Sequence, residues 1–202
     1  MNTCYIVGAG DFFGEIKPNN TDLVIAADGG YDTLCRLGVR CDLLIGDMDS
    51  LSAKDSKAER IVFPVEKDET DMFLAYMTGV EKGYTDFRIY GGVGGRIDHT
   101  FANFSLLIYA KNAKNNATLI ADGYEVFAIK NEKITLSGEI HKTFSVFAFG
   151  GVASGVSIRQ AKYEAENLTL SPDFPLGVSN SFTDKECEIE VRDGVLLVMR
   201  EI

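Results

Sequence analysis

The sequence lacks the features that would place the protein in a membrane or on a secretory route. No run approaches the roughly 18 apolar residues that a membrane-spanning helix needs. Residues 1–5 have no basic segment of the kind that begins a secretory signal peptide. We therefore expect a cytoplasmic protein with no membrane partner.

Cysteine and histidine are scarce, and their spacing fits no metal motif. The four cysteines, Cys4, Cys35, Cys41 and Cys187, form no CxxC pair and have no zinc-like spacing. They are expected to be reduced thiols, mostly in the core. The two histidines, His99 and His141, are too far apart to suggest a two-histidine metal site. The sequence also contains no Walker A motif, which excludes a P-loop kinase.

Basic residues are also scarce relative to acidic ones. Lys and Arg number 20 against 30 Asp and Glu, which gives a formal net charge of −10. Nucleic acid is therefore not an expected partner, because its backbone is bound mainly by Lys and Arg. A single nucleotide is compatible with this charge, since metal ions can offset carboxylates locally.

The first half of the chain, residues 1–122, alternates short apolar runs with helical segments. Continuous apolar runs of this length are typical of parallel strands that are buried on both faces. The expected strands are Cys4–Val7, Leu23–Ala26, Leu43–Ile45, Ile61–Phe63, Phe87–Tyr90 and Thr118–Ile120. The alternation predicts a Rossmann-like α/β domain with a mostly parallel sheet.

Three helices are expected between these strands: Tyr31–Leu37, Thr70–Lys82 and Ile97–Asn112. In the second helix, Phe73, Leu74, Met77 and Val80 form the predicted apolar stripe, and Asp71 lies off that stripe in the first turn. In the third, Phe101, Phe104, Ser105 and Ile108 share a face.

The second half, residues 123–202, consists of short strands, several of which alternate apolar with polar residues. The strands are Glu125–Ile129, Phe144–Ala148, Val156–Arg159, Glu164–Leu170, Cys187–Val191 and Val195–Met199. The dipeptide Asp193–Gly194 predicts a hairpin turn between the last two. We expect a second domain here, an antiparallel β-sandwich.

Four acidic or glycine-rich clusters follow apolar runs in the first half. They are Ala27–Gly30, Gly46–Ser50, Asp68–Asp71 and Gly91–His99. Open α/β sheets bind ligands at the carboxyl ends of their strands. Carboxylates gathered at this edge suggest a divalent metal, and glycines beside an arginine suggest phosphate.

Each cluster also has a purely structural interpretation. Asp47 and Asp49 can share a Mg²⁺ ion, or one can form a turn while the other caps a helix. Thr70 can cap the helix that Asp71 begins. The segment Gly91–Asp98 gives the strongest local signal, because so many glycines permit close backbone approach to a ligand.

The loop Gly8–Gly14 resembles a dinucleotide-binding fingerprint, but its last spacing is one residue too long. No clear helix follows the loop either. We therefore interpret it as a loop near phosphate and reject a nicotinamide-cofactor site.

The four clusters together resemble the thiamine pyrophosphokinase (thiamin diphosphokinase) family. The family's ADGG turn, GD-x-D-S turn, T-D pair at a helix start and GG-x-x-GR-x-D segment occur in order between Ala27 and Asp98. The architecture is also similar, because the family joins an α/β domain to a β-sandwich. The family works as a homodimer, with thiamine bound between subunits.

The resemblance implies roles for individual residues. The implied metal ligands are Asp47, Asp49 and Asp71. The implied ATP contacts are Asp28, Gly29, Gly30, Thr70, Gly92, Gly95 and Arg96. The implied thiamine contacts are Asp98, Tyr163, Ser179 and Asn180, with Tyr163 stacking on thiamine from the partner subunit.

The implied reaction converts ATP and thiamine into thiamine diphosphate and AMP, with Mg²⁺ as the cofactor. The hydroxyethyl oxygen of thiamine attacks the β-phosphorus of ATP, so positioning and charge neutralisation supply most of the catalysis. Arg96 would stabilise the transferred group, and either Asp71 or Asp98 would orient the hydroxyl. Two alternatives are a metal-dependent nucleotide pyrophosphohydrolase and a non-catalytic protein that binds nucleotide or thiamine.

Overall fold

Residues 2–46, 58–62 and 68–202 are described by the structure, a computed structural model. The chain forms two compact units. One comprises Met1–Leu106 and Lys114–Asp122, and the other comprises Leu107–Ala113 and Gly123–Ile202. No helix in the described ranges is long and apolar enough to cross a membrane.

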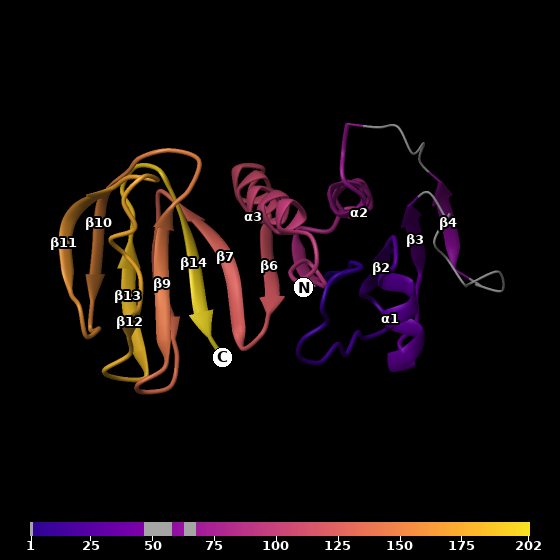
Figure 1. The fold of residues 1–202 in the computed structure, drawn as a ribbon, viewed down its shortest axis with the longest axis horizontal. Coiled ribbons are helices and arrows are strands. Elements are labelled where there is room, and N and C mark those ends of the chain that lie inside the picture. Colours follow the sequence, from indigo (N-terminus) through magenta and orange to yellow (C-terminus); the bar gives the residue numbers. More distant parts are fainter. Residues whose placement is uncertain (1, 47–57, 63–67) are drawn as a thin grey trace. The chain divides into compact units, whose positions relative to one another are not determined.

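The first unit contains a parallel sheet in the order β6-β5-β1-β2-β3-β4. Strands β6, β2, β3 and β4 are labelled in Figure 1. The strands are β1 Thr3–Val7, β2 Leu23–Ala27, β3 Leu43–Gly46, β4 Glu59–Val62, β5 Asp86–Tyr90 and β6 Asn116–Ala121. Every residue of β2 and β3 is buried, as their continuous apolar sequences predict. The expected parallel sheet is therefore confirmed.

The strand order reverses between β1 and β5. From β1 the chain continues outward through β2, β3 and β4, and then returns to place β5 on the other side of β1. The loops that leave β1 and β5 therefore begin next to each other at the carboxyl edge of the sheet. Such a point is where open α/β sheets form their ligand-binding crevice.

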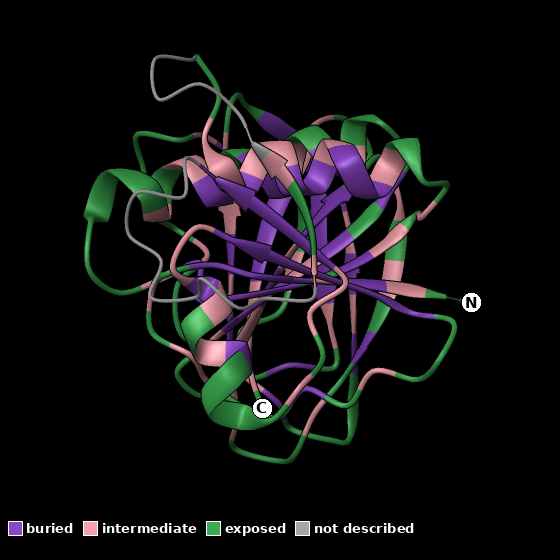
Figure 2. Ribbon diagram, turned by 90° about the vertical axis from the view of Figure 1, so that its right-hand side faces the viewer, coloured by how far each residue is buried: buried purple, intermediate pink, exposed green. Residues whose placement is uncertain are grey.

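Helices cover both faces of this sheet. Helix α1 (Gly30–Leu37) packs Leu34 into a cluster with Val24 and Leu44. Helix α2 (Asp71–Glu81) approaches the opposite face, where a Cβ atom on Gly79 would lie 2.6 Å from the Phe87 ring. Helix α3 spans Ile97–Asn112. Figure 2 shows that burial is concentrated in the strands, whereas the helices also carry exposed residues.

Two predicted helix faces are wrong. In α2 the buried residues are Met72, Ala75, Tyr76, Thr78 and Gly79, whereas the predicted stripe is only partly buried. The reason is Gly79, because its missing side chain lets the α2 backbone approach the sheet. In α3, Phe101 is 58% exposed and Ser105 is exposed, whereas Asn103, Leu106, Leu107 and Ala110 are buried.

The second unit contains two antiparallel sheets, ordered β12-β9-β14-β7 and β11-β10-β13-β8. The strands are β7 Tyr124–Lys130, β8 Lys133–Ser137, β9 Thr143–Ala148, β10 Ala153–Arg159, β11 Ala165–Leu170, β12 Asn180–Ser181, β13 Glu186–Glu190 and β14 Val195–Glu201. One core holds Phe144 and Val198 from the first sheet together with Ile158 and Ile189 from the second. The expected β-sandwich is confirmed, although β8 and β12 were not predicted.

The predicted hairpin at Asp193–Gly194 is wrong. Strand β13 pairs with β10 and β8, whereas β14 pairs with β7 and β9, so the turn passes from one sheet to the other. The N–H of Gly194 donates to Asn131 Oδ1 at 2.8 Å, and the N–H of Asp193 donates to Ser154 O at 3.1 Å. These bonds, to Asn131 between β7 and β8 and to Ser154 in β10, replace the pairing that a hairpin would make.

The cysteine prediction is partly correct. All four thiols are free, and Cys4 and Cys187 are buried. Burial raises the pKa of Cys187 to about 12. Cys35, however, is exposed on α1 rather than packed in the core.

Candidate functional site

A cavity of about 310 Å³ lies in the first unit, beside the loops that follow β1 and β5. Its walls come from five segments that are distant in sequence. They are Gly8–Gly10 after β1, Ala27 and Asp28 after β2, Asp71 and Met72 at the start of α2, the glycines 91, 92, 94 and 95 after β5, and Arg96, His99 and Asn103 around α3.

Two glycine-containing loops form the cavity wall and are bonded to each other. The N–H of Gly8 donates to Tyr90 O at 2.8 Å, and the N–H of Gly10 donates to Gly91 O at 2.9 Å. The N–H of Asp11 donates to Val93 O at 2.8 Å. The loop after β1 therefore supports the loop after β5, which explains its place at the site.

Glycine is required where these loops touch. A Cβ atom on Gly10 would lie 2.3 Å from Val93 O, and one on Gly91 would lie 2.3 Å from Gly8 O. Both distances are far below van der Waals contact, so neither position accepts a side chain without movement of the backbone.

The loop after β5 offers donors suited to an anion. Gly94 and Gly95 have φ angles of 82° and 66°, and the loop leads directly into the N-terminus of α3. In the described chain, no protein atom accepts a hydrogen bond from the N–H of Gly92, Gly94 or Gly95. Free N–H groups at a helix start, beside the Arg96 guanidinium, favour phosphate.

Arg96 is oriented by a neighbouring carboxylate. Its Nε donates to Asp98 Oδ1 at 3.1 Å and its Nη2 donates to Asp98 Oδ2 at 2.5 Å. The backbone N–H of His99 also donates to Asp98 Oδ1, at 3.0 Å. The hydrogen bond from Arg96 is the main reason that the pKa of Asp98 lies below its usual range. The carboxylate of Asp98 is thus occupied in holding Arg96.

Two carboxylates line the same cavity. Asp28 has a φ of 51°, which aspartate tolerates better than most residues, and its N–H donates to Ile45 O at 2.8 Å. Asp71 is the first residue of α2 and also lines the cavity. One or two carboxylates with phosphate oxygens suffice to bind Mg²⁺, so the donor chemistry fits a hard divalent cation.

The described residues contain no group of three or more His, Cys, Asp or Glu residues that could bind a metal. Asp47 and Asp49, the other two predicted metal ligands, lie outside the described residues. Their role therefore stays a prediction.

The structure brings together only part of the predicted ATP set. Asp28, Asp71, Gly92, Gly95 and Arg96 share the cavity wall, whereas Gly29, Gly30, Thr70 and Asp98 are not among its lining residues. Gly30 has a packing role instead, because a Cβ atom there would lie 1.8 Å from Val7 O. The Thr70 hydroxyl accepts a hydrogen bond from Phe73 N at 3.2 Å, which is the capping interpretation of that residue.

A second cavity, of about 190 Å³, lies in the second unit and includes Tyr163 and Asn180 in its wall. The N–H of Tyr163 donates to Asn180 Oδ1 at 3.0 Å, and Asn180 Nδ2 returns a bond to Tyr163 O at 2.7 Å. Residues 17 positions apart are therefore fixed side by side. Ser179 is next to this wall with a φ of 60°, and its N–H donates to Ser145 Oγ.

The rest of this second cavity is mainly apolar. Val146, Val156, Ile158, Leu168, Leu170, Leu176 and Val178 line it, and the Tyr163 ring is 58% exposed. Lys162 Nζ lies 5.2 Å from the centre of the Tyr163 ring, which shows that this ring face can accept a cation.

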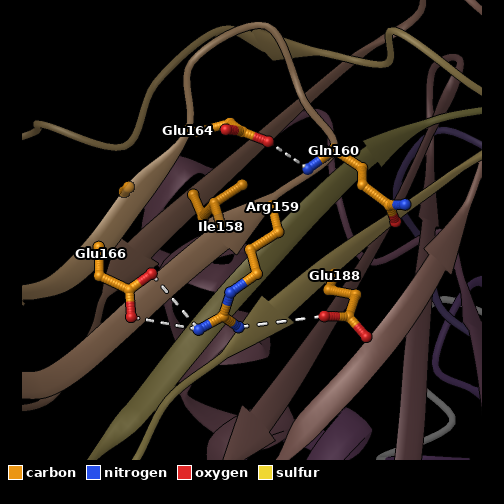
Figure 3. A pocket seen from close by; sticks show the side chains of 7 residues that line it. Ile158, Arg159, Gln160, Glu164, Glu166 and Glu188 are labelled. Carbon is orange, nitrogen blue, oxygen red and sulfur yellow. Dashed lines mark hydrogen bonds and ion pairs between the residues drawn. The ribbon is translucent and has the colours of Figure 1, made fainter.

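A larger open groove, of about 620 Å³, also lies in the second unit, and its charges are already paired (Figure 3). Arg159 bonds Glu166 at 3.3 Å and Glu190 at 3.4 Å, and it also lies 4.0 Å from Glu188. Glu164 accepts a bond from the N–H of Gln160 at 2.8 Å. Its size alone does not make it a candidate site.

Among the cavity residues that were not predicted as site residues, two have polar side chains, His99 and Asn103. Arg96, His99 and Asn103 lie at positions i, i+3 and i+7 and form one polar stripe along α3 that lines the cavity. His99 had been considered only as a metal ligand. The 3.6-residue spacing of polar side chains from Arg96 could have revealed both.

Comparisons with known proteins find two matching family models. The family model "Thiamin pyrophosphokinase, catalytic domain" matches residues 17–120, and "Thiamin pyrophosphokinase, vitamin B1 binding domain" matches residues 130–196. The chain is 25% identical to the thiamine pyrophosphokinase of Bacillus subtilis over 185 residues, which cover 88% of this chain and 86% of that protein. It is 23% identical to a Caenorhabditis elegans thiamin pyrophosphokinase, with 83% and 74% covered.

Solved structures show the same fold. The crystal structure of the Bacillus subtilis thiamine pyrophosphokinase matches with a TM-score of 0.90 at 24% identity and covers 99% of each chain. The yeast thiamin pyrophosphokinase structure matches with a TM-score of 0.77 at 18% identity, covering 100% of this chain and 86% of that one.

Proposed function

The chain belongs to the thiamin pyrophosphokinase family, whose members transfer pyrophosphate from ATP to thiamine, and we propose that its first unit binds ATP while its second binds thiamine. The observation that carries this division is the cavity of the first unit. There the free N–H groups of Gly92–Gly95 and the Arg96 guanidinium share one wall with two carboxylates. Phosphates and a metal ion need that combination.

ATP is bound through its phosphates. The transferred group would accept hydrogen bonds from the N–H groups of Gly92, Gly94 and Gly95, and its negative charge would be stabilised at the start of α3. Arg96, held by Asp98, would contact the same group with its remaining N–H donors. Because both partners are fixed before the substrate arrives, little reorganisation is needed during the reaction.

Family members use ATP, generally with a divalent metal, and here we propose Mg²⁺ held by Asp47, Asp49 and Asp71. When bound, the ion would offset the negative charge of the phosphates. Asp28, which shares the cavity with Asp71, is positioned beside it rather than included in that set.

The transfer is an in-line displacement at the β-phosphorus of ATP. The hydroxyethyl oxygen of thiamine bonds to that phosphorus while the bond to the oxygen shared with the α-phosphate breaks, so AMP leaves. Asp71, which lines the cavity, would accept the hydrogen bond of the attacking hydroxyl. Asp98 acts through Arg96, because its carboxylate is already occupied there.

Thiamine would be bound by the apolar cavity of the second unit. The Tyr163 ring would stack on thiamine, and Ser179 and Asn180 would supply polar contacts. The net charge of −10 also suits the cationic thiazolium ring. We further propose that the protein is a homodimer in which Tyr163 of one subunit contacts thiamine held at the partner's ATP site.

The deciding experiment incubates the protein with ATP, Mg²⁺ and thiamine and measures thiamine diphosphate and AMP together. Equal amounts of the two products support the proposal. ADP in place of AMP would mean transfer of a single phosphoryl group and a different reaction. ATP consumption without thiamine would instead favour the nucleotide pyrophosphohydrolase.

The metal set is tested by Asp49→Asn, which removes a charge without changing side-chain size. We expect the variant to fold normally and to lose Mg²⁺-dependent AMP formation. Asp184→Asn, at an exposed position of the second unit, is the matched control and should keep wild-type activity. Undiminished AMP formation in Asp49→Asn would contradict the assignment of Asp49 as a metal ligand.

A further inference from the structure

Asn103 is a buried polar side chain in the wall of the ATP cavity. It extends from α3, it is 5% exposed, and it lines the cavity together with Arg96 and His99. Its Nδ2 donates to Gly92 O at 2.7 Å, a bond that joins the helix to the loop after β5. Buried asparagine side chains usually have hydrogen-bond partners for both the oxygen and the NH₂ group of the amide.

The bond to Gly92 fixes which way the Asn103 amide faces. A carbonyl oxygen only accepts hydrogen bonds, so the NH₂ group must point toward Gly92. Turning the amide over would place two acceptors 2.7 Å apart. The Oδ1 atom is therefore held on the other side of the amide. No donor from the described residues bonds to that oxygen.

The free acceptor cannot serve the phosphates. Phosphate oxygens are themselves acceptors at neutral pH, so Asn103 Oδ1 would repel them, and a ligand that satisfies it must bring an O–H or N–H donor. Gly92 belongs to the phosphate-binding loop, so the donor must lie close to the phosphates. In the two substrates that condition favours hydroxyl groups, since the amino groups of adenine and thiamine are remote from the reacting phosphates.

We propose that Asn103 Oδ1 accepts a hydrogen bond from a substrate hydroxyl, which is either a ribose hydroxyl of the nucleotide or the hydroxyethyl group of thiamine. The inference rests on the proposed function and adds a substrate-contacting residue to it. Asn103 would thereby fix the phosphate loop with one end of its amide and select a hydroxyl with the other.

The test compares wild type with Asn103→Leu, a similar-sized side chain without hydrogen bonds. For the nucleotide, kcat/KM is measured with ATP, 2′-deoxy-ATP and 3′-deoxy-ATP. For the acceptor, dissociation constants are measured for thiamine and for an analogue with ethyl in place of hydroxyethyl. Wild type should prefer the hydroxyl-bearing member of one pair by about three- to tenfold, the size of one neutral hydrogen bond. In Asn103→Leu that preference should fall to about one, and the affected pair identifies the hydroxyl.

Asn115→Leu is the matched control. Asn115 is 6% exposed and its Nδ2 donates to Tyr76 Oη at 2.8 Å, yet it does not line the cavity. The control should lose stability as Asn103→Leu does but keep every hydroxyl preference. A change of preference in both variants would indicate general loosening of the unit and overturn the proposal.

A second variant guards against misfolding of Asn103→Leu. Asn103→Ala removes the amide without placing a second acceptor 2.7 Å from Gly92 O, so it should also lose the hydroxyl preference. The proposal is overturned if wild type shows no hydroxyl preference, or if Asn103→Leu keeps the wild-type preference.

Failure of the proposed function is recognised separately, because wild type would then form no thiamine diphosphate. The nucleotide arm still applies in that case, with calorimetric binding of ATP and its two deoxy analogues replacing the kinetics.

Discussion

At the scale of single residues, the proposed ATP cavity depends on backbone contacts that leave no room for side chains. Gly8, Gly10 and Gly91 bring two loops into direct contact, and three N–H···O bonds join them. The position of the N–H groups proposed to bind phosphate is thus set by neighbouring backbone rather than by long side chains. Small changes at these glycines should therefore have large effects on activity.

Gly10→Ala tests this dependence. The added Cβ would lie 2.3 Å from Val93 O and 2.7 Å from Gly91 O, so the two loops must separate. We expect a loss of kcat of about 100-fold, as is typical when reacting groups are misplaced by about 1 Å, together with a lower Tm. Gly151→Ala is the control, because nothing lies within 4 Å of its Cβ position. Equal activity of the two variants would contradict the role of the loop contact.

The ion pair of Arg96 with Asp98 predicts a pH dependence. The bond from Arg96 lowers the pKa of Asp98, so the contribution of this pair to stability is present above the ordinary aspartate pKa of about 3.9 and is lost as pH falls through the lower folded value. The difference in unfolding free energy between wild type and Asp98→Asn should therefore be constant from pH 5 to 8 and shrink below about pH 4. Urea denaturation across this range measures it. A difference that increased toward acid pH would show that the pKa shift has the opposite sign.

At the scale of elements, the sequence predicted which segments form strands and helices better than which faces they bury. The continuous apolar run Leu23–Ala26 predicts a buried strand, and β2 (Leu23–Ala27) confirms it. The face of α2 was not, because Gly79 adds no hydrophobicity although it marks the closest approach to the sheet. The turn at Asp193–Gly194 has hairpin residues, yet its hydrogen bonds go to Asn131 and Ser154, which are distant in sequence.

The candidate site, like the secondary structure, was predicted only in part. Glycine and carboxylate clusters at strand ends identified Asp28, Asp71 and Arg96, all of which line the cavity. Sequence alone could not separate ligand contacts from structural roles. Gly30 is explained by contact with Val7 O, and Asn103 became recognisable only when its partner Gly92 was known.

Substitution of Thr70, at the start of α2, tests whether this residue caps the helix or contacts ATP. Its hydroxyl accepts the N–H of Phe73, so Thr70→Ala should lower the unfolding free energy by about 1 kcal/mol and leave KM for ATP nearly unchanged. Thr70→Ser keeps the capping oxygen and should be close to wild type in stability. A large rise in KM for ATP in Thr70→Ala would restore Thr70 to the ATP site. Chemical denaturation and steady-state kinetics provide the two measurements.

At the scale of the whole molecule, the two units divide the proposed work of binding ATP and thiamine. If thiamine is shared between subunits, the protein must be a dimer in solution. We expect light scattering to give twice the protomer mass of 22.1 kDa. Tyr163→Ala should then raise KM for thiamine far more than KM for ATP. A monomeric mass with full activity would rule out a shared site.

The placement of β14 has a consequence for how the chain is made. This strand lies between β7 and β9 and pairs with both, although it follows both in the sequence. On the ribosome, β7 and β9 emerge well before the strand that bridges them, so each presents an unpaired edge during synthesis. Completion of this sheet is therefore postponed until synthesis has passed Glu201, and until then the edges of β7 and β9 that β14 will cover are open to incorrect pairing.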